Sequence, residues 1–290
     1  MPESQFLATS HNLPNISGQA TNEYLAFCDY LETLPGITLG ANKAYLVKNH
    51  LRPIFEAHGV ETLTDVIKKI QSGTDPKLKL EIIDTMTTNE TSWLRDQYPF
   101  EYIYDELLPK LTGKRMMTPR IWSAVCSYGH EAYSISMIVD EFMMKNPGCF
   151  PMGIQIVGTD ISSRVLKDAG VADFDRLAIA RGLSEERKKK YFTKTANDTY
   201  KLIDKIKNKV RFQYLNLLES YISLGKFDII FCRNVLIYFS NENKAGIMDK
   251  FAQSLHHDGI LVLGASETVT NYSKAFEMVK CPCGVVYRHF

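Results

Sequence analysis

Apolar positions in the first third of the chain recur at helical spacing. The first predicted helix begins near Thr21 and ends at the Pro35-Gly36 pair, and its apolar positions are Tyr24, Leu25, Cys28 and Leu31. Further helices are predicted from about 41 to 57, from 62 to 71, and after Asp75-Pro76, where a capping residue precedes a first-turn proline. We therefore expect an all-helical N-terminal domain over 21–86, preceded by a polar, flexible leader over 1–20.

From residue 119 onward, short apolar strands alternate with amphipathic helices. This alternation is typical of an α/β fold in which helices cover both faces of a parallel sheet. The predicted strands are 121–126, 153–158, 210–214, 227–232 and 260–263, and the predicted helices are 131–145, 162–169 and 241–256. A closing hairpin is predicted from 276–279 and 285–289, so that one domain is expected over 119–290.

Two segments do not fit this alternation. Residues 87–118 form a polar linker followed by a predicted helix over 100–111. About thirty residues, from 174 to 209, lie between the second predicted helix and the third strand. They contain a charged helix over 184–190 and two short strands, 190–194 and 200–205, joined by Thr195 to Thr199. We interpret this segment as a small inserted β subdomain.

Composition excludes several classes of protein. The formal net charge of +1 gives no overall reason to expect binding of nucleic acid or of an anionic membrane. No apolar stretch is long enough to span a membrane, and the N-terminus does not have the pattern of a signal peptide, so we expect a cytoplasmic protein. The six cysteines are scattered and imply no disulfide framework. Cys281-Pro-Cys283 lacks the spacing of a zinc knuckle, so no metal is expected.

Polar residues at the ends of two predicted strands are candidates for ligand binding. In open α/β sheets, ligands bind outside the carboxyl ends of the strands. Asp160 ends the second strand, where a carboxylate can accept both hydroxyls of a ribose; capping of the following helix is the alternative. Arg233 and Asn234 follow the fourth strand, and the alternative here is a buried arginine that binds loop carbonyls.

The opening strand of the sheet leads through a short turn, Ser127 to Gly129, into a helix. A single glycine does not make a dinucleotide fingerprint, so this turn alone does not identify a ligand. His130 stands at the helix start, where the dipole disfavours its cation, and is either a neutral polar contact or exposed. Asn89, Thr91 and Arg95 lie in the polar linker, where ordinary helix capping is the alternative to a binding role.

Several motifs, taken together and in this order, resemble the CheR family of chemotaxis receptor methyltransferases. The most specific is Cys-Arg-Asn-Val-Leu-Ile-Tyr-Phe over 232–239. The others are Thr88 to Thr91 with Arg95-Asp96, Trp122 to Ala124 with Ser127 to Ser134, Gly158 to Ile161, Asn216-Leu217, and Leu263 to Glu267. The resemblance covers about 21–289 and implies a class I, Rossmann-like methyltransferase sheet with a helical N-terminal domain.

The resemblance also implies a reaction and a set of residues. The reaction is transfer of a methyl group from S-adenosylmethionine to a receptor glutamate, which gives a glutamyl methyl ester and S-adenosylhomocysteine. By motif position, the residues that would hold the cofactor or shape its pocket are Asn89, Thr91, Arg95, Glu131, Asp160, Asn216, Leu217, Arg233 and Asn234. Arg95 and Tyr238 would stand beside the reacting methyl group.

The chain departs from the family pattern in the turn after the first strand. Where the family usually has two adjacent acids and a proline, this chain has His130-Glu131-Ala132. It also has Val125 and Tyr128 where a small residue and a threonine are usual. If the first of the two acids is the one that contacts the cofactor, His130 has replaced it.

The resemblance also implies partners. The helical domain would dock on the acidic methylation helices of a chemotaxis receptor, and Lys48 and Arg52 share one face of its second helix, with a solvated helix face as the alternative. In some relatives the inserted subdomain binds a receptor C-terminal pentapeptide through a glycine-rich loop. Here Thr195 to Thr199 contains no glycine, so we expect no dependence on such a peptide.

Two other functions are compatible with part of the pattern. The first is a methyltransferase that acts on RNA or a small metabolite, which would predict a broad basic surface or an Asn/Asp-Pro-Pro-aromatic run after the fourth strand. The second is a sensor or scaffold that binds the cofactor without methyl transfer, which is supported by the altered turn over 125–132.

Overall fold

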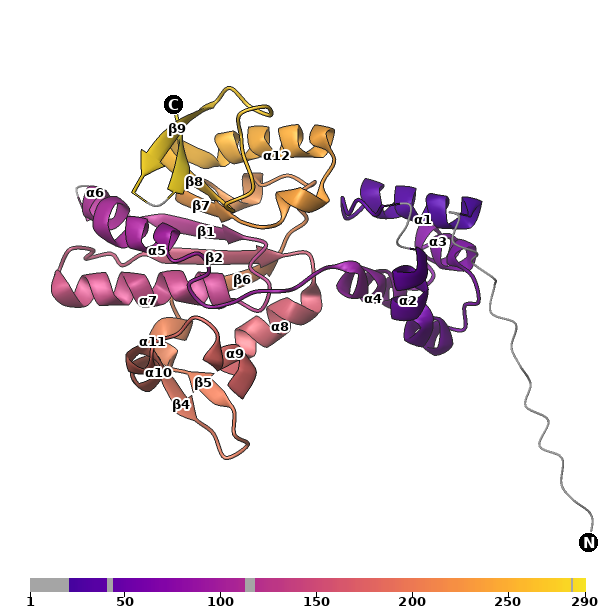
Figure 1. Ribbon diagram of the computed structural model, residues 1–290, viewed down its shortest axis with the longest axis horizontal. Helices are drawn as coiled ribbons and strands as arrows, with labels where there is room; N and C mark the ends of the chain where they lie inside the picture. The colour runs from indigo at the N-terminus through magenta and orange to yellow at the C-terminus, as the bar shows by residue number, and fades with distance from the viewer. Residues whose placement is uncertain (1–20, 41–43, 113–117, 283) are drawn as a thin grey trace, which may run out of the picture.

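The computed structural model describes residues 21–40, 44–112, 118–282 and 284–290, without the side chains of Leu46 and Lys48 (Figure 1). The flexible leader predicted over 1–20 lies outside these residues, as does Cys283 of the Cys-Pro-Cys sequence. The described chain forms a group of N-terminal helices, a large twisted sheet with helices on both faces, and a small sheet inserted below it in Figure 1.

Four helices make up the N-terminal region, as the apolar spacing predicts: α1 (Asn22–Thr33), α2 (Ala44–His58), α3 (Leu63–Gln71) and α4 (Pro76–Met86). The cap predicted at Asp75 is in place, since its side chain accepts a hydrogen bond from the Leu78 N–H, and Thr21 and Thr62 cap α1 and α3 in the same way. The helices bury their own apolar core, which includes Phe27, Leu51 and Val66.

The central sheet has seven strands in the order β6-β2-β1-β7-β8-β10-β9. The strands are β1 (Arg120–Ala124), β2 (Gln155–Asp160), β6 (Val210–Tyr214), β7 (Phe227–Cys232), β8 (Leu255–Leu263), β9 (Phe276–Cys281) and β10 (Gly284–His289). The first five are parallel, whereas β10 runs antiparallel to β8 and to β9. The expected parallel sheet and closing hairpin are therefore present.

Helices pack on both faces of this sheet, as the α/β prediction requires. On one face lie α7 (His130–Lys145) and the linker helices, and on the other lies α12 (Asn241–Ser254) (Figure 1). The helix α8 (Ser163–Val171) follows β2. β7 is buried at every position, which explains why its sequence is apolar throughout except at Asp228, which accepts the Arg120 N–H at 2.9 Å.

The linker helix is interrupted, in contrast to the single helix predicted over 100–111. It consists of α5 (Tyr98–Tyr102), one π-helical turn η1 (Ile103–Leu107) and α6 (Leu108–Thr112). The boundary of α12 also differs from the prediction, since the helix ends at Ser254 and β8 begins at once with Leu255. The polar residues 256–259 look like a loop in the sequence, but they form an irregular stretch of the strand, with Asp258 at a φ of 61°.

The insertion forms a three-stranded antiparallel sheet in the order β3-β5-β4. Its elements are β3 (Asp173–Phe174), α9 (Arg176–Ala180), α10 (Glu185–Tyr191), β4 (Phe192–Lys194), β5 (Tyr200–Leu202) and α11 (Asp204–Lys207). β3 was not predicted, because a two-residue strand has no detectable periodicity. Residues 204 and 205, expected in a strand, begin α11 instead.

A buried carboxylate attaches the insertion to the central domain. Asp140 of α7 accepts hydrogen bonds from Lys205 at 3.1 Å and Lys209 at 2.9 Å. Glu141 beside it accepts both hydrogen bonds of the Arg187 guanidinium, at 2.9 and 2.8 Å. Because the Asp140 side chain is only 4% exposed, these ion pairs are screened less than surface pairs and hold the insertion in one orientation.

A histidine clamps the N-terminal helices together. His58, at the end of α2, contacts Asp75 through Nδ1 at 2.7 Å and Glu81 through Nε2 at 2.8 Å. Two ionised carboxylates only accept hydrogen bonds, so both ring nitrogens must donate and the imidazole is cationic. These hydrogen bonds raise the pKa of His58 and lower the pKa values of Asp75 and Glu81.

His58→Gln should lower the melting temperature by several degrees at about pH 6 and by clearly less at about pH 9. The reason is that a raised histidine pKa stabilises the fold below the unfolded-state pKa, and this contribution is lost as pH rises through the folded-state pKa. Thermal unfolding at both pH values measures the difference. His257→Gln, at an exposed histidine, is the control. An equal destabilisation at both pH values would contradict the cationic clamp.

Candidate cofactor and substrate cavity

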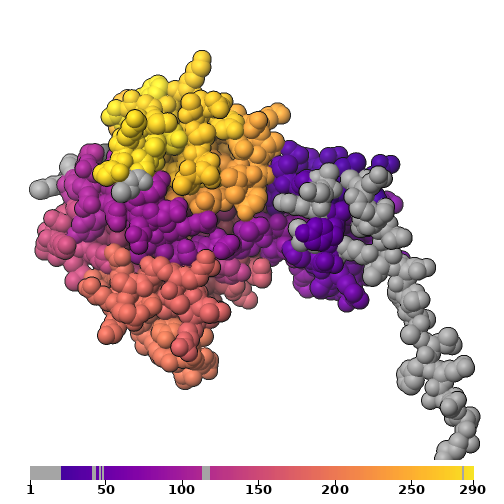
Figure 2. Space-filling model, in the orientation of Figure 1, coloured from indigo at the N-terminus to yellow at the C-terminus, as the bar shows by residue number. Residues whose placement is uncertain are grey.

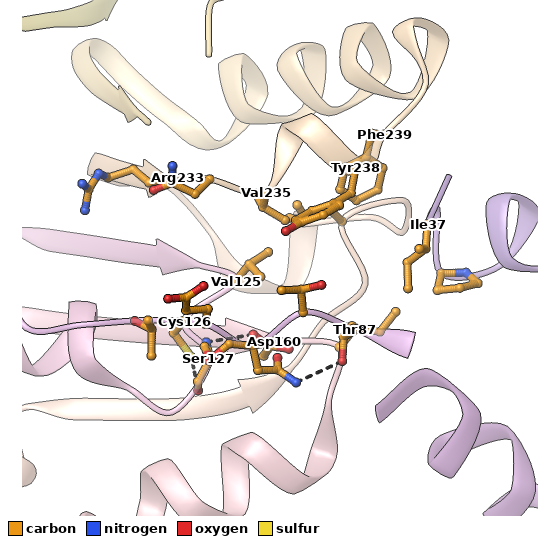
Figure 3. Close-up of a pocket in the computed structure, with 18 of the residues that line it drawn as sticks. Ile37, Thr87, Val125, Cys126, Ser127, Asp160, Arg233, Val235, Tyr238 and Phe239 are labelled. Atoms are coloured by element: carbon orange, nitrogen blue, oxygen red, sulfur yellow. Dashed lines mark hydrogen bonds between the residues drawn. The ribbon is translucent and has the colours of Figure 1, made fainter. Parts of the chain in front are cut away.

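A cavity opens at the carboxyl ends of the parallel strands, where the N-terminal helices meet the sheet (Figure 3). Figure 2 shows these helices, in indigo, packed against the side of the larger body. Five segments that are distant in sequence supply most of the wall: the α1–α2 loop, the linker, the β1–α7 turn, the loop after β6 and the loop after β7. Each of the predicted site residues in the central domain and linker lines this one cavity: Asn89, Thr91, Arg95, Glu131, Asp160, Asn216, Leu217, Arg233, Asn234 and Tyr238.

Asp160 holds the turn after the first strand against the end of the second. One carboxylate oxygen accepts the Ser127 N–H at 2.8 Å, and the other accepts the Ser162 N–H at 2.9 Å. Burial raises the pKa of the Asp160 carboxyl, and the two N–H donors oppose this effect. The helix-cap alternative for Asp160 is wrong, because the side chain of Ser162 caps α8. Each oxygen keeps lone-pair capacity for a ligand hydroxyl.

Arg233 lies in a buried ion-pair cluster behind the cavity. Its guanidinium, 2% exposed, donates to Glu131 at 3.0 Å, to Asp96 at 2.7 Å and to the carbonyl oxygen of Arg95 at 2.7 Å. In Figure 3 it points away from Tyr238. Glu131 also accepts the Ser123 hydroxyl at 2.8 Å. The alternative for Arg233, a buried arginine that binds loop carbonyls, is thus partly correct, because the guanidinium binds the Arg95 carbonyl. The main effect of the guanidinium is to fix the Glu131 carboxylate at the cavity wall.

His130 does not face this cavity. Its ring packs between Trp93, at a centroid distance of 4.6 Å, and Phe174, at 5.0 Å. Burial lowers the pKa of His130 to about 4, so the ring is neutral at physiological pH. The alternative of an exposed histidine is therefore wrong. The position after Gly129 points into the aromatic core, and the next position, Glu131, points into the cavity wall.

Arg95 and Tyr238 present unoccupied polar groups to the cavity. Neither the Arg95 guanidinium nor the Tyr238 hydroxyl has a hydrogen-bond partner among the residues that the structure describes. Tyr238 belongs to a short 3₁₀ turn, η3 (Leu236–Tyr238). Helix capping, the alternative role considered for Asn89 and Thr91, is wrong, because neither side chain caps a helix. The Asn89 side chain instead donates to the Thr87 hydroxyl at 3.1 Å.

Backbone strain is concentrated around the cavity. In the described part of the chain, five of the nine non-glycine residues with positive φ lie in its wall or directly beside Arg95: Leu94, Asp96, Val125, Ser127 and Asn234. Such conformations persist only where surrounding contacts fix them, and they gather at functional sites. The Leu94 N–H donates to the buried Ser134 hydroxyl at 3.0 Å, which is one of the contacts that hold this segment.

A loop from the N-terminal region covers part of the cavity. This strap, residues 34–39, is attached at both ends: Asn216 donates to the Leu34 carbonyl at 2.6 Å, and the Thr38 N–H donates to the Tyr238 carbonyl at 2.9 Å. Gly36 lies between them with a φ of 80°, and a Cβ there would stand 2.4 Å from Phe239. The Asn216 amide is therefore occupied by the strap, so this side chain shapes the cavity instead of presenting its amide to it.

A cation outside the cavity fixes the neighbouring loop. The carbonyl of Leu217 accepts the Tyr221 hydroxyl at 2.5 Å and the Lys250 ammonium at 3.2 Å. Lys250 also donates to the Leu218 carbonyl at 2.6 Å. These bonds immobilise the main chain next to Asn216, where it lines the cavity.

The two predicted docking residues are separate from this cavity. Arg52 lies on the exposed surface of α2 and pairs with Glu56 at 3.3 Å, with its side chain 66% exposed. The side chain of Lys48 lies outside the described residues. Such an exposed pair has little effect on stability, so Arg52 remains available for contact with a partner.

Sequence reasoning missed the strap and several wall residues. The Pro35-Gly36 pair predicts only the end of a helix, whereas in the structure the strap residues Pro35, Ile37, Thr38 and Leu39 line the cavity. Val125, Cys126 and Ser127 also line it. The one signal of the strap in the sequence is Gly36, because a glycine in a loop often marks a left-handed φ, as it does here.

The fold and the cavity define an S-adenosylmethionine-dependent methyltransferase of class I. The strand order, in which the antiparallel strand β10 lies next to the parallel strand β8, is the arrangement of that class. The cavity lies at the carboxyl ends of the strands, where such sheets bind ligands, and Asp160 is the acid at the end of the second strand. None of the helices in the described ranges is long and apolar enough to cross a membrane. No cluster of three or more metal-ligating side chains occurs in the same ranges.

Comparison with known proteins gives the family. The family model described as CheR methyltransferase, SAM binding domain, matches residues 89–285. The chain is 44% identical over 273 residues to chemotaxis protein methyltransferase 1 of Pseudomonas aeruginosa, covering 93% of this chain and 98% of that protein. It is 43% identical over 266 residues to chemotaxis protein methyltransferase 1 of Vibrio cholerae, covering 92% and 96%. The chain belongs to the CheR methyltransferase family, which confirms the resemblance seen in its motifs.

Gly36→Ala should weaken binding of S-adenosylhomocysteine by roughly ten-fold. A methyl group at this position would force the strap away from Phe239, and the strap would then lose its hydrogen bonds to Asn216 and Tyr238. Isothermal titration calorimetry measures the affinity. Gly59→Ala is the matched control, since Gly59 also has positive φ but a Cβ there meets nothing within 4 Å. Equal affinities in both variants would show that the strap does not shape the site.

Proposed function

We propose that this protein transfers a methyl group from S-adenosylmethionine to glutamate side chains of a chemotaxis receptor, giving γ-glutamyl methyl esters. The observation that carries the proposal is the convergence, in one cavity at the ends of the strands, of the residues that the family motifs single out. The curated relatives are called chemotaxis protein methyltransferases, which supports a receptor as the substrate. A cytoplasmic location is part of the same proposal, since the receptor segments concerned would be there.

The cavity fits the proposed cofactor in charge and in polar groups. Three lining carboxylates, from Glu90, Glu131 and Asp160, stand against two lining guanidiniums, from Arg95 and Arg233. Glu90 is paired with Arg181 at 3.3 Å, so Glu131 and Asp160 are the lining carboxylates that would meet the cationic groups and the hydroxyls of S-adenosylmethionine. Asn234 Oδ1 and Arg233 Nε are buried without partners among the described residues, so polar capacity remains for a ligand.

Different lining residues would bind different parts of the cofactor. Asp160 would accept the ribose hydroxyls, and Asn216 with Leu217 would form the wall beside the base. Glu131, fixed by Arg233 and Ser123, would receive the cationic end of the methionine part. Asn89 and Thr91 would line the linker side of the cavity. Because His130 faces the aromatic core, its presence in place of a family acid leaves this wall intact.

When bound, S-adenosylmethionine would supply an electrophilic methyl group on a sulfonium. The glutamate that receives it is already ionised at neutral pH, so the protein needs no general base. The Arg95 guanidinium would hold that carboxylate with two parallel hydrogen bonds, and the Tyr238 hydroxyl would donate to it from the opposite wall. Catalysis is then mainly positioning, together with exclusion of water by apolar wall residues such as Ile37 and Val235.

Two alternatives receive less support. The sensor hypothesis rested on the altered turn over 125–132, yet Glu131 and Ser127 of this turn contribute normally to the cavity. A methyltransferase for RNA would need a broad basic surface, whereas the chain is nearly neutral and its fourth strand is followed by Arg233-Asn234-Val235.

Receptor docking is proposed on the exposed face of α2. Arg52 is accessible there, and Lys48 precedes it by one helical turn. Positive side chains on this helix suit the acidic methylation helices of a receptor and would act mainly on the rate and orientation of encounter.

The wild-type protein should bind S-adenosylmethionine in calorimetry and transfer tritiated methyl groups to receptor-containing membranes, and Arg95→Ala should reduce that transfer by about a hundred-fold or more. S-adenosylhomocysteine affinity should stay within about three-fold, because Arg95 is proposed to orient the substrate carboxylate.

Arg176→Ala, which removes an exposed guanidinium of the insertion, is the control and should transfer at the wild-type rate. A near-normal rate for Arg95→Ala would remove Arg95 from the mechanism. Cofactor binding by the wild type without any transfer would favour the sensor.

A receptor C-terminal pentapeptide should not bind with micromolar affinity. The loop that would receive it, Thr195 to Thr199, contains no glycine and is closed by a Thr195–Thr199 hydroxyl hydrogen bond at 2.7 Å and a Lys194–Asp198 ion pair at 2.5 Å. Fluorescence anisotropy with labelled peptide measures this, and saturable binding at micromolar concentration would overturn the expectation.

A further inference from the structure

The loop after β7 has a path that its own sequence does not explain. Residues 233–239 carry Arg233 at one end and Tyr238 at the other, and Asn234 between them has a φ of 58°. The first three N–H groups of the turn, from residues 234 to 236, point away from the sheet ladder. Unpaired N–H groups in a buried loop are costly, so the position of this loop depends on what accepts their hydrogen bonds.

One carboxylate accepts all three. Glu267, in the loop after β8, takes the Asn234 N–H at 2.8 Å on Oε2, and the Val235 and Leu236 N–H groups at 2.9 and 2.8 Å on Oε1. Oε2 also accepts the N–H of Gly264 at 2.8 Å. Glu267 therefore ties the 233–239 loop to the end of β8, yet it is not among the residues that line the cavity.

The effect of this clamp reaches Tyr238 through the main chain. The Val235 carbonyl accepts the Tyr238 N–H at 3.1 Å, and it belongs to the same peptide group as the Leu236 N–H that donates to Glu267. On the other side, the Tyr238 carbonyl accepts the Thr38 N–H of the strap at 2.9 Å. The tyrosine is thus held between the Glu267 clamp and the strap, and its hydroxyl points into the cavity (Figure 3).

We propose that Glu267 is a positioning residue of the methyl-transfer site, which acts by fixing the 233–239 loop so that the Tyr238 hydroxyl faces the incoming carboxylate. The inference rests on the proposed function, because it assigns Tyr238 a part in the transfer.

The chemistry of the clamp requires a glutamate. Four N–H donors converge on two oxygens, and an ionised carboxylate is the side chain that accepts four hydrogen bonds without offering a donor. In Glu267→Gln, the amide NH₂ would face two of these donors and push them apart. Gly264 fits the same geometry, since a Cβ there would lie 2.6 Å from Glu267 Oε2 and 2.9 Å from the Asn234 nitrogen.

The test is a double-mutant cycle on methyl transfer with Glu267→Gln, Tyr238→Phe and the double variant. Glu267→Gln should lower kcat by roughly ten- to a hundred-fold, because a shift of about 1 Å in a catalytic group has an effect of this size. KM for S-adenosylmethionine and the affinity for S-adenosylhomocysteine should change by less than about three-fold, since Glu267 does not line the cavity.

In the Tyr238→Phe background, Glu267→Gln should have almost no further effect, since the hydroxyl that it positions is gone. Glu242→Gln is the matched control: it makes the same change at an exposed carboxylate in α12 and should keep the wild-type rate. If Glu267→Gln does not fold, Glu267→Asp, whose shorter arm cannot reach all four donors, takes its place in the same cycle.

Additive effects in the double variant would overturn the inference, as would a large rise in KM with kcat unchanged. A Tyr238→Phe variant with full activity would also overturn it, because Glu267 would then have no catalytic group to position. Absence of transfer by the wild-type protein would instead contradict the proposed function, so the two failures are distinguishable.

Discussion

The ion-pair cluster of Arg233 is the interaction on which the cavity depends. A guanidinium that is 2% exposed must be matched by acceptors, and here Glu131, Asp96 and the Arg95 carbonyl supply them. These acceptors come from two other parts of the chain, so satisfying one buried charge brings together the β7 end, the α7 start and the linker. Removing one partner would leave a buried charge without compensation, which is why such clusters tolerate change poorly.

The same cluster joins two parts of the cavity to which the proposed function assigns different roles. It fixes Glu131 at the cavity wall and holds the backbone of Arg95, whose own side chain remains free of partners among the described residues. The strained residues on either side of Arg95, Leu94 and Asp96, are kept in place by these contacts. The site therefore combines rigid supports with a few uncommitted polar groups, as the proposed positioning of the reactants requires.

The insertion packs behind the linker that lines the cavity. Trp93 packs edge-on against Phe174 and Phe192 of the insertion, at centroid distances of 4.9 and 5.3 Å. His130 completes the cluster at the start of α7. The Gly182 backbone approaches so closely that a Cβ there would stand 2.0 Å from the Trp93 carbonyl oxygen. A segment that the sequence presents as an added subdomain is thus part of the wall behind Asn89 to Arg95.

The sequence by itself determined most of the elements of secondary structure. Apolar periodicity and turn residues located the N-terminal helices, the parallel strands and the closing hairpin, because these depend on local spacing and on local capping by Thr21, Thr62 and Asp75. The motifs also identified residues that line one cavity, including Asp160, Arg233 and Tyr238. Local spacing was insufficient where long-range pairing decides. In β8 the polar stretch 256–259 lies between Leu255 and Ile260, which both pair with β7.

Only the tertiary structure decided what each site residue touches. Adjacent residues on a helix point in different directions, so the sequence could not show that His130 enters an aromatic core while Glu131 meets Arg233. It could not show that the Asn216 amide is occupied by the strap, or that Glu267 holds the Tyr238 loop. These contacts join residues that are far apart in the chain, and their energies depend on burial and geometry, which exist only once the chain is folded.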